Sequence, residues 1–286
     1  FNKQFVLSTT DPYFTQDGVS RTFDLYYKTT RPYDAQGGDY EIKKPGIGIR
    51  FGVPFTERDT VYFGIGAERV TVVEGNELPE AYLDQGGTYL PATIGWSRDE
   101  RDSALVPTEG RYQRFNTEFG LSSERRYAKL SYQFQQYIPL TKQYTFAFNT
   151  DLGWGQGLNG QDYPLFKNFY VGGLGSVRGF EQSTLGPKDS GIYLGGPKKV
   201  VFNAEFITPF PGAGNDKTLR MFAFTDVGKA FGQDENVSFS QLRASAGIGL
   251  SWISPMGPLR FSYGVPIRKQ SDDRIQKLQF QIGTSF

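Results

Sequence analysis

Residues 242–252, LRASAGIGLSW, alternate strictly between two kinds of side chain. One set is apolar, namely Leu242, Ala244, Ala246, Ile248, Leu250 and Trp252. The other is small or polar, namely Arg243, Ser245, Gly247, Gly249 and Ser251. Because successive side chains of a β-strand point to opposite faces, this stretch predicts a strand with one apolar and one polar face. The alternation recurs in GIGIRFGVPF (46–55), YTFAFNTDLGW (144–154) and KLQFQIGTSF (277–286).

The whole chain can be divided into strands of this kind. We predict thirteen, near residues 1–9, 19–30, 44–54, 60–72, 88–100, 110–121, 127–138, 144–154, 198–209, 217–229, 239–253, 258–267 and 277–286. Most have about ten residues or more, whereas strands of soluble proteins usually have about five or six and strands that cross a bilayer have about 9 to 11. The lengths therefore favour a membrane barrel over a soluble sandwich.

Alternation alone does not decide which face points inward. The polar face repeatedly carries charge, at Arg50, Glu68, Arg114, Glu118, Asp151, Glu205, Arg243 and Arg260. Charged side chains and glycines on one face are typical of a water-filled barrel lumen, and the opposite face then contacts lipid. We therefore predict an all-β fold, an antiparallel transmembrane β-barrel.

Composition excludes several classes of protein. The 286 residues contain 31 Lys and Arg against 30 Asp and Glu, so the net charge of +1 is too small to attract nucleic acid. The chain has no cysteine and no histidine, which rules out thiolate and imidazole metal ligands and the usual nucleophile–base pairs. We expect no metal, no cofactor, no nucleic-acid partner and no enzymatic activity.

The connections between strands alternate in length. Short turns are expected at 10–18, 55–59, 101–109, 139–143, 210–216 and 254–257, and loops that are mostly longer at 31–43, 73–87, 122–126, 155–197, 230–238 and 268–276. Outer-membrane barrels have short periplasmic turns and longer extracellular loops. Bacterial barrels of one chain normally have even strand numbers, so an odd count predicts that N-terminal strands are missing.

The longest connection, 155–197, contains VGGLGSVRGFEQSTLGPKD (171–189). A phosphate-binding glycine motif is a weak reading, because the third glycine would have to be at Arg178. The loop is too apolar to lie in water, with Phe166, Phe169, Tyr170, Val171, Val177 and Phe180. We expect it to fold back into the lumen, where Arg178 needs an acid. Asp226, which shares a strand face with Phe224, and Glu205 are both within plausible reach.

Several motifs together resemble the BamA-like family of outer-membrane protein assembly factors. They are NFYVGGLGSVRGFEQSTLGPKD (168–189), NAEFITPF (203–210), FTDVG (224–228), SAGIGLSWISPMGPLRFSYGVPI (245–267) and FQIGTSF (280–286). The resemblance implies that residues 1–286 are the C-terminal portion of a sixteen-stranded barrel in the bacterial outer membrane. The first barrel strands and the POTRA domains that precede the barrel in the family are absent from these residues.

The resemblance also implies a function and site residues. The barrel would fold and insert other β-barrel proteins through a lateral seam, with nascent outer-membrane proteins, accessory lipoproteins and the lipid bilayer as partners. The motif Val177, Arg178, Gly179 and Phe180 would lock the inward loop to the wall through Asp226, near Glu205 and Phe224. The C-terminal seam and insertion signal would comprise Phe280, Ile282, Gly283 and Phe286. Two alternatives remain at this point, a two-partner-secretion pore of the same superfamily and a passive channel.

Overall fold

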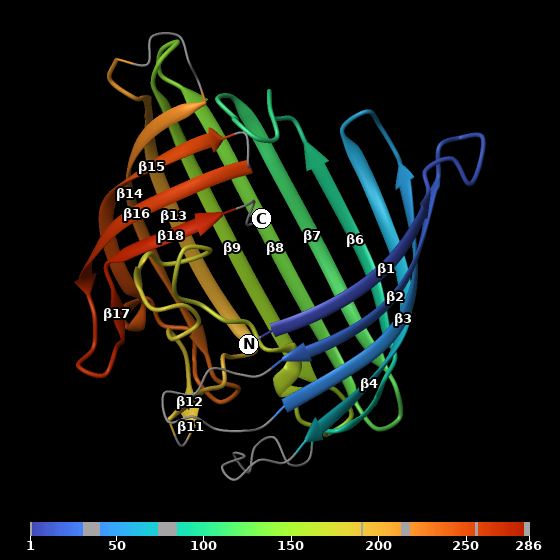
Figure 1. Cartoon of the computed structure of the whole chain (residues 1–286). Coiled ribbons are helices and arrows are strands. Elements are labelled where there is room, and N and C mark those ends of the chain that lie inside the picture. The colour runs from blue at the N-terminus through green and yellow to red at the C-terminus, as the bar shows by residue number, and fades with distance from the viewer. Residues whose placement is uncertain are drawn as a thin grey trace.

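A computed structural model describes residues 2–30, 41–73, 85–189, 191–212, 218–254 and 257–282. Thirteen strands follow one another in a single antiparallel sheet that curves around a central space (Figure 1). They are β1 (Asn2–Asp11), β2 (Ser20–Thr30), β3 (Glu41–Pro54), β4 (Asp59–Val73), β6 (Pro91–Asp99), β7 (Gly110–Leu121), β8 (Arg126–Pro139), β9 (Thr145–Gly157), β13 (Lys198–Pro209), β14 (Leu219–Phe231), β15 (Arg243–Ser254), β16 (Gly257–Arg268) and β18 (Leu278–Ile282). The predicted class of fold is confirmed.

Every strand of this series pairs with its neighbour in sequence order, and β1 and β18 form the two ends of the order. Between the described residues of β1 and β18 there is no pairing. We call the concave side of the sheet the lumen. In Figure 1 the connections β1–β2, β3–β4, β6–β7 and β8–β9 lie at the upper end of the sheet, so alternate connections share one end, as the sequence predicted.

The apolar face of the sheet points outward. In β15, Ile248 is 59% exposed whereas Ser245 is 0% exposed. In β18, Phe280 is exposed and its neighbour Gln279 is buried. A soluble barrel would bury the apolar side chains and expose the polar ones, so this arrangement requires a lipid environment. The interpretation of the polar face as the luminal face is confirmed.

Two predicted strands differ from the observed ones. The strand expected at 88–100 is broken at Leu90, because a separate short strand, β5 (Gly87–Tyr89), pairs with β4 before β6 begins at Pro91. Proline has no N–H to give to a ladder, which favours an interruption there. The strand expected at 239–253 begins only at Arg243, because residues Phe239–Gln241 form a short 3-10 turn, η2.

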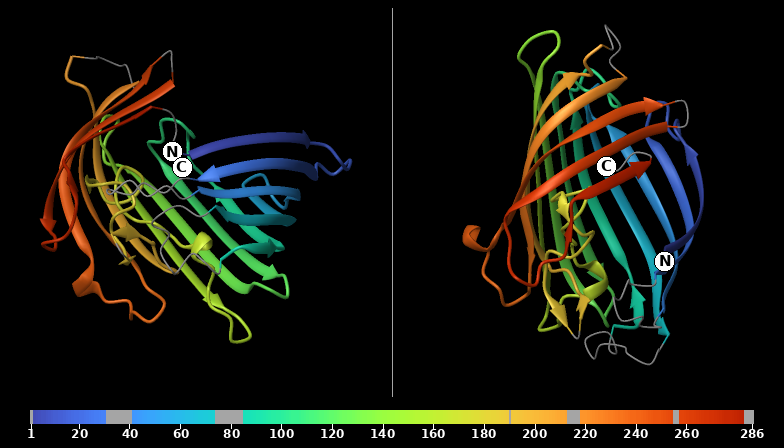
Figure 2. Two further views of the ribbon diagram at one scale, coloured as in Figure 1. Left: turned by 60° about the horizontal axis from the view of Figure 1, so that its bottom comes forward. Right: turned by 60° about the vertical axis from the view of Figure 1, so that its left-hand side comes forward.

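The loop between β9 and β13 lies inside the curved sheet, as two further views show (Figure 2). Its regular elements are η1 (Leu165–Lys167), a 3-10 turn, and three short strands, β10 (Gly179–Phe180), β11 (Lys188–Asp189) and β12 (Ile192–Tyr193). β10 pairs with β17 (Ile275–Gln276), which precedes β18. Among the described residues, no helix has the length and apolar character needed to cross a membrane.

Candidate functional site

The centre of the candidate site is an ion pair between the inward loop and β14. Arg178 donates from Nε to Oδ2 of Asp226 and from Nη2 to Oδ1, both at 2.7 Å. The backbone N–H of Arg178 donates to the same Oδ2 at 2.9 Å. Arg178 is 3% exposed and Asp226 is 0% exposed. Two parallel hydrogen bonds match the planar fork of arginine, so the pair fixes the orientation of the loop as well as its position.

A second carboxylate, in addition to that of Asp226, pairs with Arg178. Glu205, on β13, accepts from Arg178 Nη1 through Oε1 at 2.5 Å. The same oxygen accepts from Nη2 of Arg260, on β16. The cluster therefore contains two guanidinium groups and two carboxylates, counting Asp226. The Arg260 side chain is 37% exposed, whereas Arg178 and Asp226 are buried. A buried charge without a partner is costly, and this balance removes that cost.

Strand register explains why acids from two strands meet at one arginine. β13 pairs with β14 so that Asn203 lies opposite Asp226 and Glu205 lies opposite Phe224. Residues directly opposite one another share a face of the sheet, here the luminal face. Asn203 strengthens the arrangement, because its Nδ2 donates to Asp226 Oδ1 at 2.8 Å and to the carbonyl of Ser176 at 2.6 Å.

Aromatic rings cover the Arg178 guanidinium. Its Cζ lies 3.7 Å from the centroid of the Phe224 ring and 5.5 Å from that of Phe222. A cation over a ring face gains electrostatic attraction that grows when water is excluded. Burial disfavours the charged form of Arg178, but Glu205 and Asp226 outweigh burial and raise the pKa of the guanidinium above its ordinary value. Arg178 is therefore charged at every pH at which the protein is folded.

Gly179 is the point at which the loop backbone crosses β16. Its φ is +87°, a conformation that favours glycine. A Cβ placed on Gly179 would lie 3.0 Å from the backbone carbonyl carbon of Gly264, and a Cβ on Gly264 would lie 2.8 Å from the nitrogen of Gly179. Both residues must be glycine for the two backbones to approach this closely.

The residues on either side of Arg178 and Gly179 are buried. Val177 and Phe180 are both 0% exposed, and they pack in a cluster with Val171, Leu185, Val201 and Ala230. Gln279 of β18 connects this tip to the C-terminal strand. Its Oε1 accepts from the N–H of Gly179 at 3.3 Å, and its Nε2 donates to the carbonyl of Phe180 at 2.6 Å.

The predicted C-terminal residues lie apart from this cluster. Phe280 and Ile282 are on the outer face of β18, and the ring centroids of Phe280 and Phe261 are 4.4 Å apart. Gly283 and Phe286 lie outside the described residues. Their role in a seam or insertion signal stays a prediction.

The sequence reasoning missed the contributions of Asn203 and Gln279 and a second charged contact of the loop at Lys167. Lys167 pairs with Glu68 at 2.7 Å and with Glu118 at 2.9 Å. A signal was present, because Lys167 is the one charged residue in the aromatic stretch PLFKNFY (164–170) and cannot be buried without a partner.

The contacts of the site fix the conformation of the loop. Arg178, Asp226 and Glu205 hold the loop against the wall, and Arg260 pairs with Glu205. Among the residues that the structure describes, no group of three or more acidic side chains is placed to bind a metal ion. The arrangement is suited to fixing one position of the loop, because a bidentate, buried pair specifies orientation.

Comparison with known proteins identifies similar chains. Residues 1–286 match the Omp85 superfamily domain. The chain is 38% identical to the outer membrane protein assembly factor BamA of Neisseria meningitidis serogroup B over 98% of its own length, and it spans 41% of that protein. The chain thus covers about two fifths of the length of this relative.

Two solved structures have a fold similar to that of this chain. The fold is similar to BamA from Haemophilus ducreyi lacking POTRA domains 1–3, with a TM-score of 0.85 and 26% identity, over 98% of this chain and 61% of that one. It is also similar to CdiB from Acinetobacter baumannii, with a TM-score of 0.63 and 13% identity, over 98% of this chain and 49% of that one. The second likeness is one of fold alone.

Proposed function

The chain belongs to the Omp85 superfamily, and we propose that it forms the membrane barrel of an outer-membrane protein assembly factor. The observation that carries the proposal is the 38% identity, over nearly the whole chain, to a protein named as such a factor. The outward apolar face and the buried Arg178 cluster support it, because both are consistent with a bacterial outer-membrane barrel that holds a loop in its lumen.

In this proposal the barrel acts without bond chemistry. It would receive nascent outer-membrane proteins and help their strands pair and enter the bilayer through a lateral seam. An exposed strand edge binds another strand through backbone hydrogen bonds, which gives an incoming strand a template. Unpaired backbone groups are expensive in lipid, so a template lowers the cost of insertion. Accessory lipoproteins would act as further partners of the full-length protein.

The secretion-pore alternative has less support. The likeness to CdiB is 13% identity and concerns the fold alone. A passive channel would explain the polar luminal face, but it gives no reason for the loop to be fixed by a buried ion-pair cluster in that lumen.

The test uses the full-length protein in lipid vesicles. A urea-denatured outer-membrane barrel protein is added, and its folding is followed by the change in gel mobility that folded barrels show before heating. We expect faster folding than in empty vesicles. Steady ion conduction with no acceleration of folding would favour the channel, and selective binding of a secreted partner would favour the secretion pore.

A further inference from the structure

The inward loop has a second charged anchor, on other strands than the one at Arg178. Lys167, the last residue of η1, places Nζ 2.7 Å from Glu68 Oε1 and 2.9 Å from Glu118 Oε1. Glu68 lies on β4 and Glu118 on β7, with β6 between these strands. The Lys167 side chain is 14% exposed, so the three charges are largely removed from water. An ion pair in such surroundings is stronger than one at the surface.

The wall holds both carboxylates in place for Lys167. The hydroxyl of Tyr26, on β2, donates to Glu68 Oε2 at 2.9 Å. The hydroxyl of Tyr127, on β8, donates to Glu118 Oε1. Hydroxyl groups of neighbouring strands therefore orient both carboxylates that bind Lys167.

The backbone of η1 is bound to the same wall. The carbonyl of Lys167 accepts from Lys129 Nζ, on β8, at 2.7 Å, and also from the hydroxyl of Tyr163 in the loop itself at 2.9 Å. The N–H of Leu165 donates to Gln85 Oε1 at 3.1 Å. The side chain and the backbone of the turn are therefore both held.

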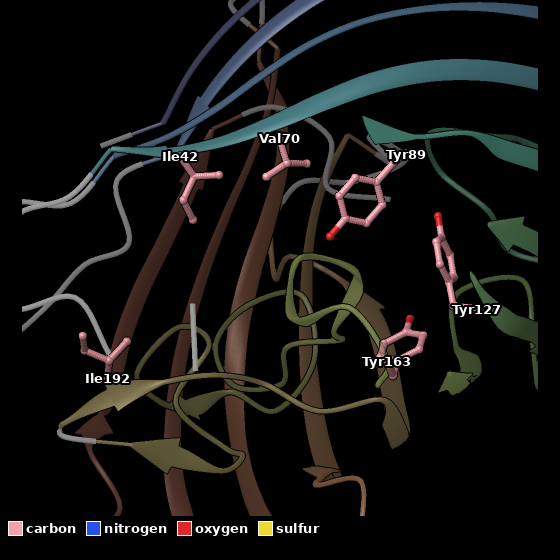
Figure 3. Packing of buried hydrophobic residues seen from close by; sticks show 6 residues of the cluster. All are labelled: Ile42, Val70, Tyr89, Tyr127, Tyr163 and Ile192. Atoms are coloured by element: carbon pink, nitrogen blue, oxygen red, sulfur yellow. The ribbon is translucent and has the colours of Figure 1, made fainter. Parts of the chain in front are cut away.

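An apolar layer surrounds this anchor. Figure 3 shows Tyr163 and Ile192 of the loop facing side chains of the wall, namely Ile42, Val70, Tyr89 and Tyr127. The rings of Tyr127 and Tyr163 are perpendicular, with centroids 6.0 Å apart. Edge-to-face contacts of this kind fix ring orientation as well as burying area.

The wall stays balanced in charge without Lys167. Lys44, on β3, lies close enough to interact with Glu68, and Lys129 lies close enough to interact with Glu118. Removing Lys167 leaves two glutamates beside two lysines. Loss of the Lys167 charge should therefore weaken the hold of this wall on the loop and leave the strands folded.

Lys167 keeps its charge in this setting. Burial disfavours the charged form, but Glu118 and Glu68 outweigh burial and raise the pKa of Lys167 well above its ordinary value. Lys167 is therefore charged at neutral pH.

We propose that residues 165–180 form a strut along the luminal face of the wall, in which the Lys167 anchor holds the β2–β8 part of the wall at a fixed distance from the β13–β18 part held by Arg178. Between the anchors, the Phe169 ring lies against β9 at Gly153 and under Lys199 of β13. β4 and β14 are separated in the sheet by β6, β7, β8, β9 and β13. Ladder hydrogen bonds fix the spacing of neighbouring strands, whereas the twist between them varies from pair to pair, so many strands together leave the curvature adjustable. A strut bound to the wall at both ends removes that freedom.

The strut is tested by measuring a distance across the barrel in the full-length protein in vesicles. The 286 residues contain no cysteine, so cysteines replacing Ile65 on β4 and Ile248 on β15 would be the labelling sites in this region. Both side chains are exposed on the outer face, away from the loop. Pulsed electron paramagnetic resonance then measures the distribution of distances between the two spin labels, and so between β4 and β15.

We expect a single narrow distance peak in the parent protein and its loss in Lys167→Met. The peak should be restored by the charge exchange Lys167→Glu plus Glu118→Lys combined with Glu68→Gln, which removes the acid that would repel the new glutamate. Lys188→Met is the matched control, because Lys188 lies in the same loop but forms only an exposed pair with Asp272 at 3.4 Å. The narrow peak should persist in that variant.

A narrow peak that survives in Lys167→Met would overturn the proposal. So would failure of Lys167→Met to fold, judged by gel mobility, because the wall would then depend on Lys167 for stability. Lack of rescue by the charge exchange would show that charge is not the basis of the anchor. The distance is measured without any assembly reaction, so this result is independent of the proposed function.

Discussion

Asp226 accepts three hydrogen bonds from Arg178, two from the guanidinium and one from the backbone N–H. One carboxylate on β14 thereby fixes both the side chain and the main chain of a loop residue 48 positions earlier. Glu205 neutralises charge in the same cluster, but of the two acids only Asp226 also accepts a hydrogen bond from the loop backbone at Arg178. Asp226 is therefore the residue on which the position of the loop most directly depends.

Replacing Asp226 with Asn should release the loop. The variant keeps the shape of the side chain but leaves Arg178 with a single acid, Glu205, that is already shared with Arg260. Breaking one partner of a buried ion pair costs about 3–5 kcal/mol. We expect a fall of this order in the free energy of unfolding, measured by urea titration in vesicles, and new protease cleavage within 171–189. In Asp272→Asn, where the acid is exposed, the free energy should change by less than about 1 kcal/mol.

Arg178→Lys tests the fork geometry of the guanidinium. Lysine keeps the positive charge, but a compact ammonium cannot give parallel hydrogen bonds to Asp226 and also reach Glu205 with the same geometry. We expect the loop to be cleaved by protease faster than in the parent protein and more slowly than in Arg178→Ala. Protection equal to that of the parent would mean that charge alone holds the loop.

Gly179→Ala should displace the loop from β16. The backbone has a φ of +87°, and a Cβ would approach the Gly264 carbonyl carbon to 3.0 Å. The left-handed conformation alone costs an alanine about 1–2 kcal/mol. Gly175→Ala is the control in the same loop, since a Cβ there meets nothing within 4 Å. Urea titration should show destabilisation of the first variant only. Equal stability of the two variants would contradict the close crossing.

The sequence predicts those contacts of the site that follow from alternation along a single strand, and it does not predict those that depend on the path of the loop. Alternation along β13 and β14 places Glu205 and Asp226 on the luminal face, and both strands follow the loop directly, so their meeting with Arg178 could be predicted. Lys167 was different, because its partner Glu68 lies on a distant strand and alternation shows only that Glu68 faces the lumen. The path of the loop across the lumen decides which luminal acids it meets. That path follows from the packing of Tyr163 and its neighbours, which no local pattern encodes.

The turn between β6 and β7 should loosen in acid through Asp102. Burial of Asp102 favours the neutral acid, but hydrogen bonds from the Thr108 side chain and from the backbone N–H groups of Thr108 and Glu109 outweigh burial and lower the pKa of Asp102. The folded-state pKa then lies below the unfolded value of about 3.9, so the stabilisation is complete above that value and is lost as pH falls through the folded-state pKa. Pepsin should cut at the exposed Leu105 increasingly as pH falls.

The control for this turn is Asp102→Asn, which cannot titrate. Its cleavage at Leu105, normalised to cleavage at the exposed Leu140 of the next turn, should not change with pH. The same pH dependence in Asp102→Asn as in the parent would assign the effect to another group.

The last strand should depend on the loop through Gln279. Its side chain is 4% exposed and bonds to the N–H of Gly179 and the carbonyl of Phe180, so the tip of the loop and β18 share two hydrogen bonds. Gln279→Met keeps the size of the side chain but leaves both backbone groups without this partner, and an unsatisfied buried group costs about 1–3 kcal/mol. We expect faster hydrogen exchange of the amides of β18, where the strand pairs with β16 from Leu278 to Ile282. Gln276→Met, at an exposed position of β17, should leave this exchange unchanged. If β18 exchanged at the parent rate in Gln279→Met, the loop and the C-terminal strand would be independent, and movement of the loop could not be transmitted to the edge of the sheet through this contact.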